Sequence, residues 1–118
     1  MHHLVMHQKD ELNAGRLRGS LDLLVLKTIS LGPLHGYGIA QHLLRVTSDG
    51  LQVGESALYP ALQRLLVNGW AKAEWRTSET GRRARYYTLT SKGRKRLEEE
   101  EREFEQLVRT VRLVLEAV

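Results

Sequence analysis

The chain has 118 residues, of which 42% are hydrophobic and 27% charged, so it can form one domain with a core of its own. The absence of cysteine excludes disulfides and thiolate metal sites, and no apolar run approaches the roughly 20 residues of a membrane span. The formal net charge of +4 is unevenly distributed, because residues 76–96 hold eight basic residues and one acidic residue. Such a local basic segment is typical of proteins that bind nucleic acid.

The first 15 residues show no hydrophobic periodicity, so we expect a mobile tail there. This segment is too short and too polar for a secretion signal, which favours a cytoplasmic protein without a membrane partner. His3 and His7 are four residues apart, but only Asp10 and Glu11 lie near enough in the sequence to complete a metal site. A tail without metal is therefore the favoured interpretation.

Two short helices are expected next. The first starts after Ser20, whose hydroxyl is expected to cap the helix, and ends at Gly32-Pro33 because proline cannot continue the hydrogen-bond ladder. The second starts with two glycines around Tyr37, which indicate a close approach of the backbone, and ends at an Asp-Gly turn. For His35 we expect a packing or capping role. Leu51 and Val53 alternate with a polar residue, which indicates a minimal strand.

A third helix is predicted over residues 55–68. Four leucines at helical spacing form its apolar face, and Pro60 fixes its start near Ser56. The opposite face is polar but nearly uncharged, whereas an ordinary surface helix would carry more Glu and Lys. The side chains on this face and its flank are Ser56, Tyr59, Pro60, Gln63, Arg64 and Val67. Because several of these pair with base edges or phosphates, we interpret the helix as a recognition helix, with a plain surface helix as the alternative.

Residues 70–89 read as two strands joined by a polar turn, which predicts a β-hairpin. Arg82, Arg83 and Arg85 give it a basic tip, and contact with phosphates is favoured over a merely solvated tip. Trp70 and Trp75 are expected on opposite faces, and we favour core packing for both over a stacking site for an effector. Three helices followed by a hairpin form a winged helix-turn-helix, with the third helix in the major groove and the wing on the backbone or minor groove.

A long helix is expected from Thr90 or Ser91 to the C-terminus. At about 1.5 Å per residue it would span roughly 40 Å, more than a small domain can cover, so a homodimer is favoured over folding back. Its apolar stripe, the expected dimer interface, consists of Leu97, Phe104, Leu107, Val108, Val111, Val114, Leu115 and Val118. The cations between Lys92 and Arg96 oppose the helix dipole, which indicates a role in binding DNA.

These elements resemble the PadR family of bacterial transcriptional regulators. The resemblance is carried by five motifs, at residues 19–26, 32–40, 58–65, 69–70 and 83–93. It implies a homodimeric winged-helix repressor held together by the C-terminal helix, with no cofactor and with a small planar or hydrophobic effector. The DNA-facing positions that it implies are Tyr37, Ser56, Tyr59, Gln63, Arg64, Arg82, Arg83 and Arg85.

The expected fold is mostly α (α+β). Its parts are a tail at 1–15, a winged helix-turn-helix domain at 16–90 and a dimerisation helix at 91–118. The leading hypothesis is a dimeric DNA-binding regulator, a repressor relieved by a small molecule, on a pseudo-palindromic operator of double-stranded DNA. The alternative is a winged-helix protein-interaction module, which the basic segment disfavours. An enzyme is not expected, because the sequence has no cysteine nucleophile, metal-ligand set or glycine-rich phosphate loop.

Overall fold

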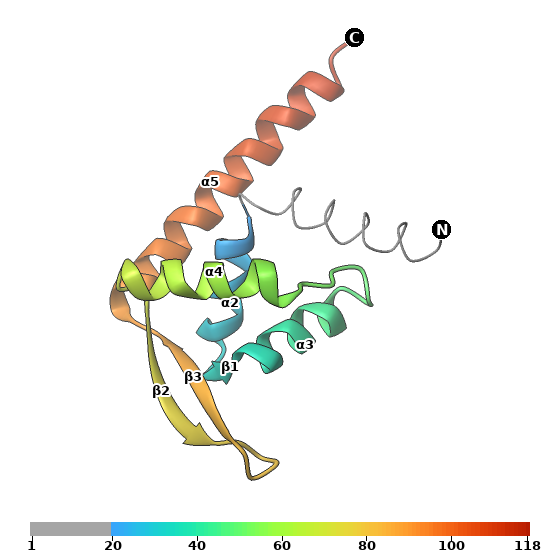
Figure 1. Cartoon of the computed structure of the whole chain (residues 1–118). Helices are drawn as coiled ribbons and strands as arrows, with labels where there is room; N and C mark the ends of the chain where they lie inside the picture. The colour runs from blue at the N-terminus through green and yellow to red at the C-terminus, as the bar shows by residue number, and fades with distance from the viewer. Residues whose placement is uncertain (1–19) are drawn as a thin grey trace.

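The computed structural model describes residues 20–118, so the expected tail and the pair His3 and His7 lie outside the described residues. In chain order the elements are α2 (Leu21–Ser30), β1 (Leu34–His35), α3 (Gly36–Val46), α4 (Glu55–Val67), β2 (Ala71–Thr77), β3 (Arg83–Leu89) and α5 (Ser91–Leu115). In Figure 1 the β2–β3 hairpin and the far half of α5 project in opposite directions from a body of three helices. This is the predicted winged helix with a long C-terminal helix.

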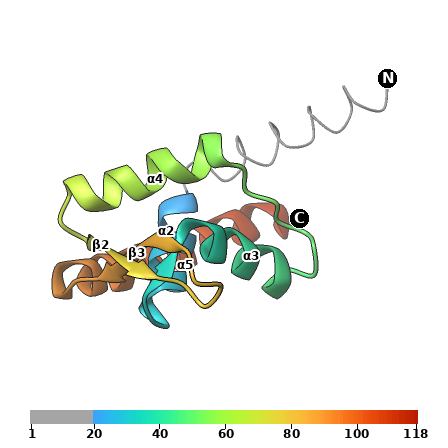
Figure 2. The ribbon, with the colours of Figure 1, turned by 60° about the horizontal axis from the view of Figure 1, so that its bottom comes forward.

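The core lies where α2 meets the other elements. α2 packs against α3, α4, α5 and β3, and Figure 2 shows α4 crossing the outside of the body above α2 and α3. The largest fully buried side chains are Val25, Leu26, Ile29, Ile39, Leu62 and Leu65. Each such side chain contributes about 1.5–3 kcal/mol when it leaves water, so the leucine spacing seen in the sequence is what fixes α4 on the body.

The ends of the helices follow local capping chemistry, with one exception. The His35 ring caps α3 by accepting a hydrogen bond from the Gly38 N–H at 2.9 Å, which confirms the capping role. Thr90 caps α5 in the same way, with Oγ1 accepting from the Gly93 N–H at 3.0 Å. Ser20 precedes α2 as expected, but its hydroxyl makes no capping bond, so that detail was wrong. Ser20 has helical backbone angles, whereas a capping side chain is best placed on an extended residue.

The sheet has the strand order β1-β3-β2, and both pairings are antiparallel. The strand expected at Leu51 and Val53 is absent from the described structure. Leu51 is buried, but its backbone N–H donates to the Thr47 hydroxyl at 2.9 Å, so the segment is a loop fixed to the end of α3. The extra strand is instead β1, where Leu34 pairs with Tyr87. Its two residues are too few for a periodic pattern.

The hairpin forms the wing. Its register runs from Ala71 opposite Leu89 to Thr77 opposite Arg83, and Gly81 adopts a left-handed conformation with φ of 83° in the turn. Trp70 is half-buried against the core, as expected. Trp75 was also expected to pack in the core, but it is 61% exposed, because β2 has extended beyond the helical body at that point.

α5 consists of a buried beginning and an exposed continuation. Leu97 is 5% exposed and belongs to the core of its own chain, so its assignment to the dimer interface was wrong. The helix passes the edge of the body soon afterwards, and Phe104, Leu107 and Val114 are exposed. The alternative in which α5 folds back on its own domain is therefore not seen in residues 20–118. None of the helices described is long and apolar enough to cross a membrane.

Candidate nucleic-acid interface

The outer face of α4 is polar and open to solvent. The buried side, with Leu58, Ala61, Leu62 and Leu65, anchors the helix to the core. The opposite side exposes Ser56, Tyr59 and Gln63, as the sequence predicts, together with Pro60 and Val67. Hydroxyl and amide groups on an exposed helix of 13 residues have the size and chemistry that reading a major groove requires.

Tyr37 and Tyr59 lie at the meeting point of α3 and α4. Tyr37 is 72% exposed at the start of α3, and Tyr59 is 52% exposed on α4. Gly36 lies beside them without crowding, because a Cβ there would make only ordinary contacts, 3.8 Å from the Tyr59 hydroxyl oxygen and 3.9 Å from a methyl of Leu58. The close approach expected from the glycines around Tyr37 occurs instead at Gly38, where a Cβ would lie 2.8 Å from a methyl of Leu34 in β1.

A broad concavity of about 1400 Å³ separates α3 and α4 from the wing. All four tyrosines of the chain and one of its two tryptophans line it, namely Tyr37, Tyr59, Tyr86, Tyr87 and Trp75. The charged side chains among the described residues around it are four arginines and one carboxylate: Arg45, Arg82, Arg83, Arg85 and Glu79. A concave, strongly positive surface with aromatic walls favours a polyanion over a neutral ligand.

The wing arginines differ in how firmly they are held. Arg82 and Arg83 are exposed at the turn, where the Ser78 N–H donates to the Arg82 carbonyl oxygen at 2.6 Å. Arg85 is exposed on β3, with its guanidinium 5.9 Å from the centre of the Tyr87 ring. All three lie on the hairpin that borders the concavity, as the sequence predicts.

The basic cluster at the start of α5 is only partly available. Lys92, Arg94 and Lys95 are exposed. Arg96 is half-buried: it bonds Glu100 at 2.6 Å and lies 5.0 Å from the centre of the Trp70 ring. A carboxylate four residues later thus pairs with Arg96 along α5, so this cation stabilises the start of the helix and is less available than its neighbours.

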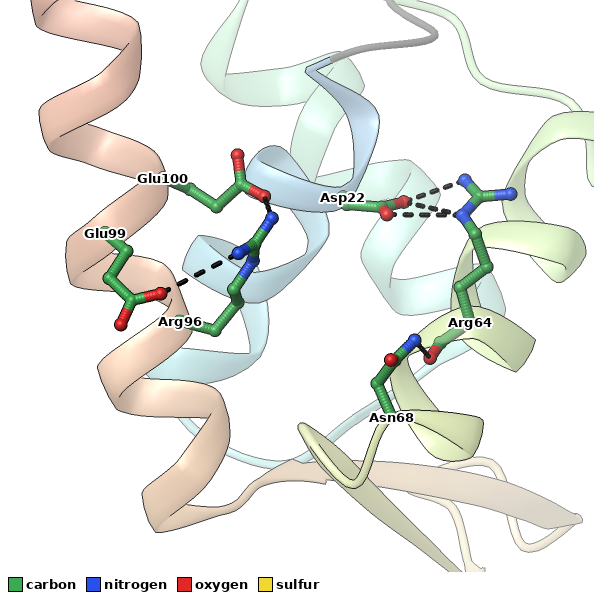
Figure 3. A network of polar contacts seen from close by, with 6 residues as sticks. All are labelled: Asp22, Arg64, Asn68, Arg96, Glu99 and Glu100. Atoms are coloured by element: carbon green, nitrogen blue, oxygen red, sulfur yellow. Dashed lines mark hydrogen bonds and ion pairs between the residues drawn. The ribbon is translucent and has the colours of Figure 1, made fainter.

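Arg64 is bonded to the first helix of the body rather than free on the face of α4. Its Nη2 donates to Asp22 Oδ1 at 2.7 Å, and its Nε lies 3.2 Å from both carboxylate oxygens (Figure 3). This hydrogen bond with Asp22 raises the pKa of Arg64 above its ordinary value. Sequence reasoning missed the pair, because the partners are 42 residues apart and each alone has an ordinary explanation.

Three helices, a small antiparallel sheet and a basic wing beside an exposed third helix define the class of winged-helix DNA-binding proteins. Residues 25–99 match the transcriptional regulator PadR-like family, so the chain belongs to that family, whose members are DNA-binding transcriptional regulators and not enzymes.

Similar proteins support the same assignment. The chain is 35% identical over 94 residues to Transcriptional regulator Rv3488 of Mycobacterium tuberculosis, a match that covers 80% of this chain and 84% of the relative. A PadR-like transcriptional regulator from Bacillus cereus has a TM-score of 0.74 at 27% identity, covering 86% of this chain and 97% of that one. A PadR family regulator from Eggerthella lenta also has a TM-score of 0.74, at 29% identity, covering 98% of this chain and 95% of the other.

Proposed function

We propose that the protein is a homodimeric, sequence-specific transcriptional repressor that places α4 in the major groove and the wing on the neighbouring backbone or minor groove. The observation that carries the proposal is the continuous surface formed by the polar face of α4 and the arginine-rich concavity beside it. Ser56, Tyr59 and Gln63 would sample base edges. Tyr37 and the wing arginines would hold the sugar-phosphate backbone.

The exposed stripe of α5 supports the dimer. Its exposed members are Phe104, Leu107, Val111, Val114 and Leu115, on a helix of 25 residues that is about 37 Å long; Val108 is half-buried and Val118 follows the end of the helix. A helix with an apolar stripe at this spacing is stabilised when the stripe packs against another apolar surface and is removed from water. A second copy supplies such a surface, and a two-fold axis would place two recognition helices on a pseudo-palindromic operator with half-sites about 10 bp apart.

Repression, relief by a small hydrophobic or aromatic effector and a cytoplasmic location are the finer parts of the proposal. Repression and relief by an effector rest on membership of the family. The cytoplasmic location rests on the need of a bacterial regulator to reach chromosomal DNA. An effector that repositions the two α5 helices would change the distance between the two recognition helices. Binding to the operator requires that this distance match the spacing of its two half-sites.

The test is selection of a duplex by the full-length protein from a random DNA library, followed by fluorescence-anisotropy titration of the selected duplex and a scrambled one. We expect the selected duplex to bind at least about 1000-fold more tightly, with a log–log salt slope steeper than about −4. Equal, weak binding of both duplexes would contradict the proposal and favour a protein-interaction module.

A further inference from the structure

The ion pair between Asp22 and Arg64 joins the candidate recognition helix to the first helix of the body. Figure 3 shows the Arg64 guanidinium turned back from α4 towards the α2 carboxylate. The contact uses two of the three guanidinium nitrogens and both carboxylate oxygens. Paired N–H donors on one carboxylate fix direction as well as distance, which a single ammonium group cannot do.

This contact adds a directional restraint to the apolar packing of α2 against α4. α2 and α4 also pack through aliphatic side chains of the core, whose individual van der Waals contacts are weak and carry no donor–acceptor direction. The side chain of Asp22 is 22% exposed and that of Arg64 47% exposed, so the pair lies at the rim of the helix contact, partly shielded from water. Because the pair lies away from the centre of the helix contact, it opposes rotation of α4 more strongly than a contact at the centre would.

The C-terminal end of α4 is fixed beside the same residue. The Asn68 amide donates to the Arg64 carbonyl oxygen at 2.8 Å, and the Asn68 backbone N–H donates to the same oxygen at 3.0 Å. Arg64 therefore links the last turn of α4 to α2 through its side chain while its carbonyl closes the helix. Ser56, Tyr59 and Gln63 belong to the same rigid helix, so their orientation depends on this link.

We propose that Arg64 is a positioning residue for DNA recognition, and that its pairing with Asp22 sets the rotation at which α4 presents Ser56, Tyr59 and Gln63 to the bases. The proposal rests on the proposed function and adds one part to it, a role for Arg64 through the orientation of its neighbours. Asp22 holds the guanidinium side-on through Nε and Nη2, which fixes the plane of the group and leaves the outer N–H groups of Nη1 and Nη2 outside the pair.

The substitution Asp22→Asn separates this role from direct contact by the sign of its effect. Removing a carboxylate beside the DNA face raises the net charge by one and frees Arg64, so an arginine that only contacts phosphate would bind DNA more tightly. A positioning pair predicts the opposite, because the unpaired Arg64 no longer holds α4. We expect Asp22→Asn to weaken binding of the selected duplex about tenfold while binding of the scrambled duplex changes less than about twofold.

Glu74→Gln is the matched control. Glu74 also pairs with an arginine, Arg76, but both residues belong to β2, so the substitution adds the same charge without releasing α4. We expect it to leave the ratio of selected to scrambled affinity unchanged. Arg64→Gln should lower that ratio as Asp22→Asn does, with a salt slope within about 0.3 of wild type, whereas loss of a phosphate contact would change the slope by about 0.9.

The charge-reversed double variant Asp22→Arg with Arg64→Asp provides the rescue. We expect it to recover at least about threefold of the specificity lost by Arg64→Asp alone, with circular dichroism confirming folded protein. An Asp22→Asn protein that is folded and binds the selected duplex as tightly as wild type, or more tightly, would overturn the positioning role alone. A wild-type protein that does not distinguish the two duplexes would overturn the proposed function itself.

Discussion

Replacing Gly93 by alanine would place a methyl group inside the junction between α5 and the start of the wing. The added Cβ would overlap the backbone carbonyl oxygen of Trp70 and would lie 2.8 Å from its carbonyl carbon and 2.7 Å from a methyl of Leu89. The overlap and both distances are closer than Cβ atoms approach their neighbours in real structures. A carbonyl group that is itself hydrogen-bonded, accepting from the Thr90 N–H at 3.0 Å, cannot simply move aside.

The expected cost follows from the contacts that must change. Overpacking a buried site costs about 1–3 kcal/mol, and a shift of the first turn of α5 would also weaken the Thr90 cap, worth about 1 kcal/mol. Alanine has about 1 kcal/mol higher helix propensity than glycine, which offsets part of this cost. We therefore expect Gly93→Ala to lower the free energy of unfolding by about 2 kcal/mol.

Urea unfolding at fixed protein concentration, followed by circular dichroism, measures this change. Gly36→Ala is the matched control, since Gly36 is also a buried glycine near the start of a helix but its added Cβ would make only ordinary contacts at 3.8–3.9 Å. The control should stay within about 0.5 kcal/mol of wild type or be slightly more stable. A Gly93→Ala protein within about 0.5 kcal/mol of wild type would refute the reasoning about this junction.

Three further predictions concern the cap, the wing and α5. Thr90→Val should lower the free energy of unfolding by about 1–2 kcal/mol in urea titrations. The lost hydroxyl accepts a hydrogen bond from the Gly93 N–H and donates one to the Gly69 carbonyl oxygen at 2.6 Å. Thr90→Ser, which keeps the hydroxyl, should keep most of the stability. Arg82→Ala combined with Arg83→Ala should make the salt slope of DNA binding shallower by about 2, since each lost phosphate contact removes about 0.9; an unchanged slope would exclude wing contacts with phosphate. Val111→Asp should convert the dimer to a monomer in light scattering at micromolar concentration, because it places a charge in the apolar stripe, while Arg109→Asp on another face of α5 should remain dimeric. A dimeric Val111→Asp protein would mean that the stripe is not the interface.

Much of the fold could be predicted because it depends on local chemistry. The leucines of α4, the cap at Thr90 and the left-handed Gly69, with φ of 73°, each have a signature within a few residues. The exposed polar face of α4 could be predicted for the same reason, since a helix that buries one apolar face exposes the opposite one. These features agree in sequence and structure because the information that specifies them is short-range.

The parts that sequence reasoning missed depend on distant partners. Leu97 continues the apolar spacing of α5, and nothing in that spacing marks where the helix leaves the body. Asp22 suits a helix start and Arg64 suits a DNA-facing helix, so neither residue alone indicates the bond between them. Tryptophan is a residue type often buried in cores, but Trp75 is exposed because β2 extends beyond the helical body at that point. Each case required the three-dimensional arrangement.

The most direct test of the central claim is a hydroxyl-radical footprint of the wild-type protein on the duplex selected from the random library. A two-fold dimer with one recognition helix per copy predicts two protected patches about one helical turn apart on the same face of the duplex, related by a dyad in the sequence. A single protected patch, or uniform protection without a dyad, would contradict a dimeric regulator that reads an operator with paired α4 helices.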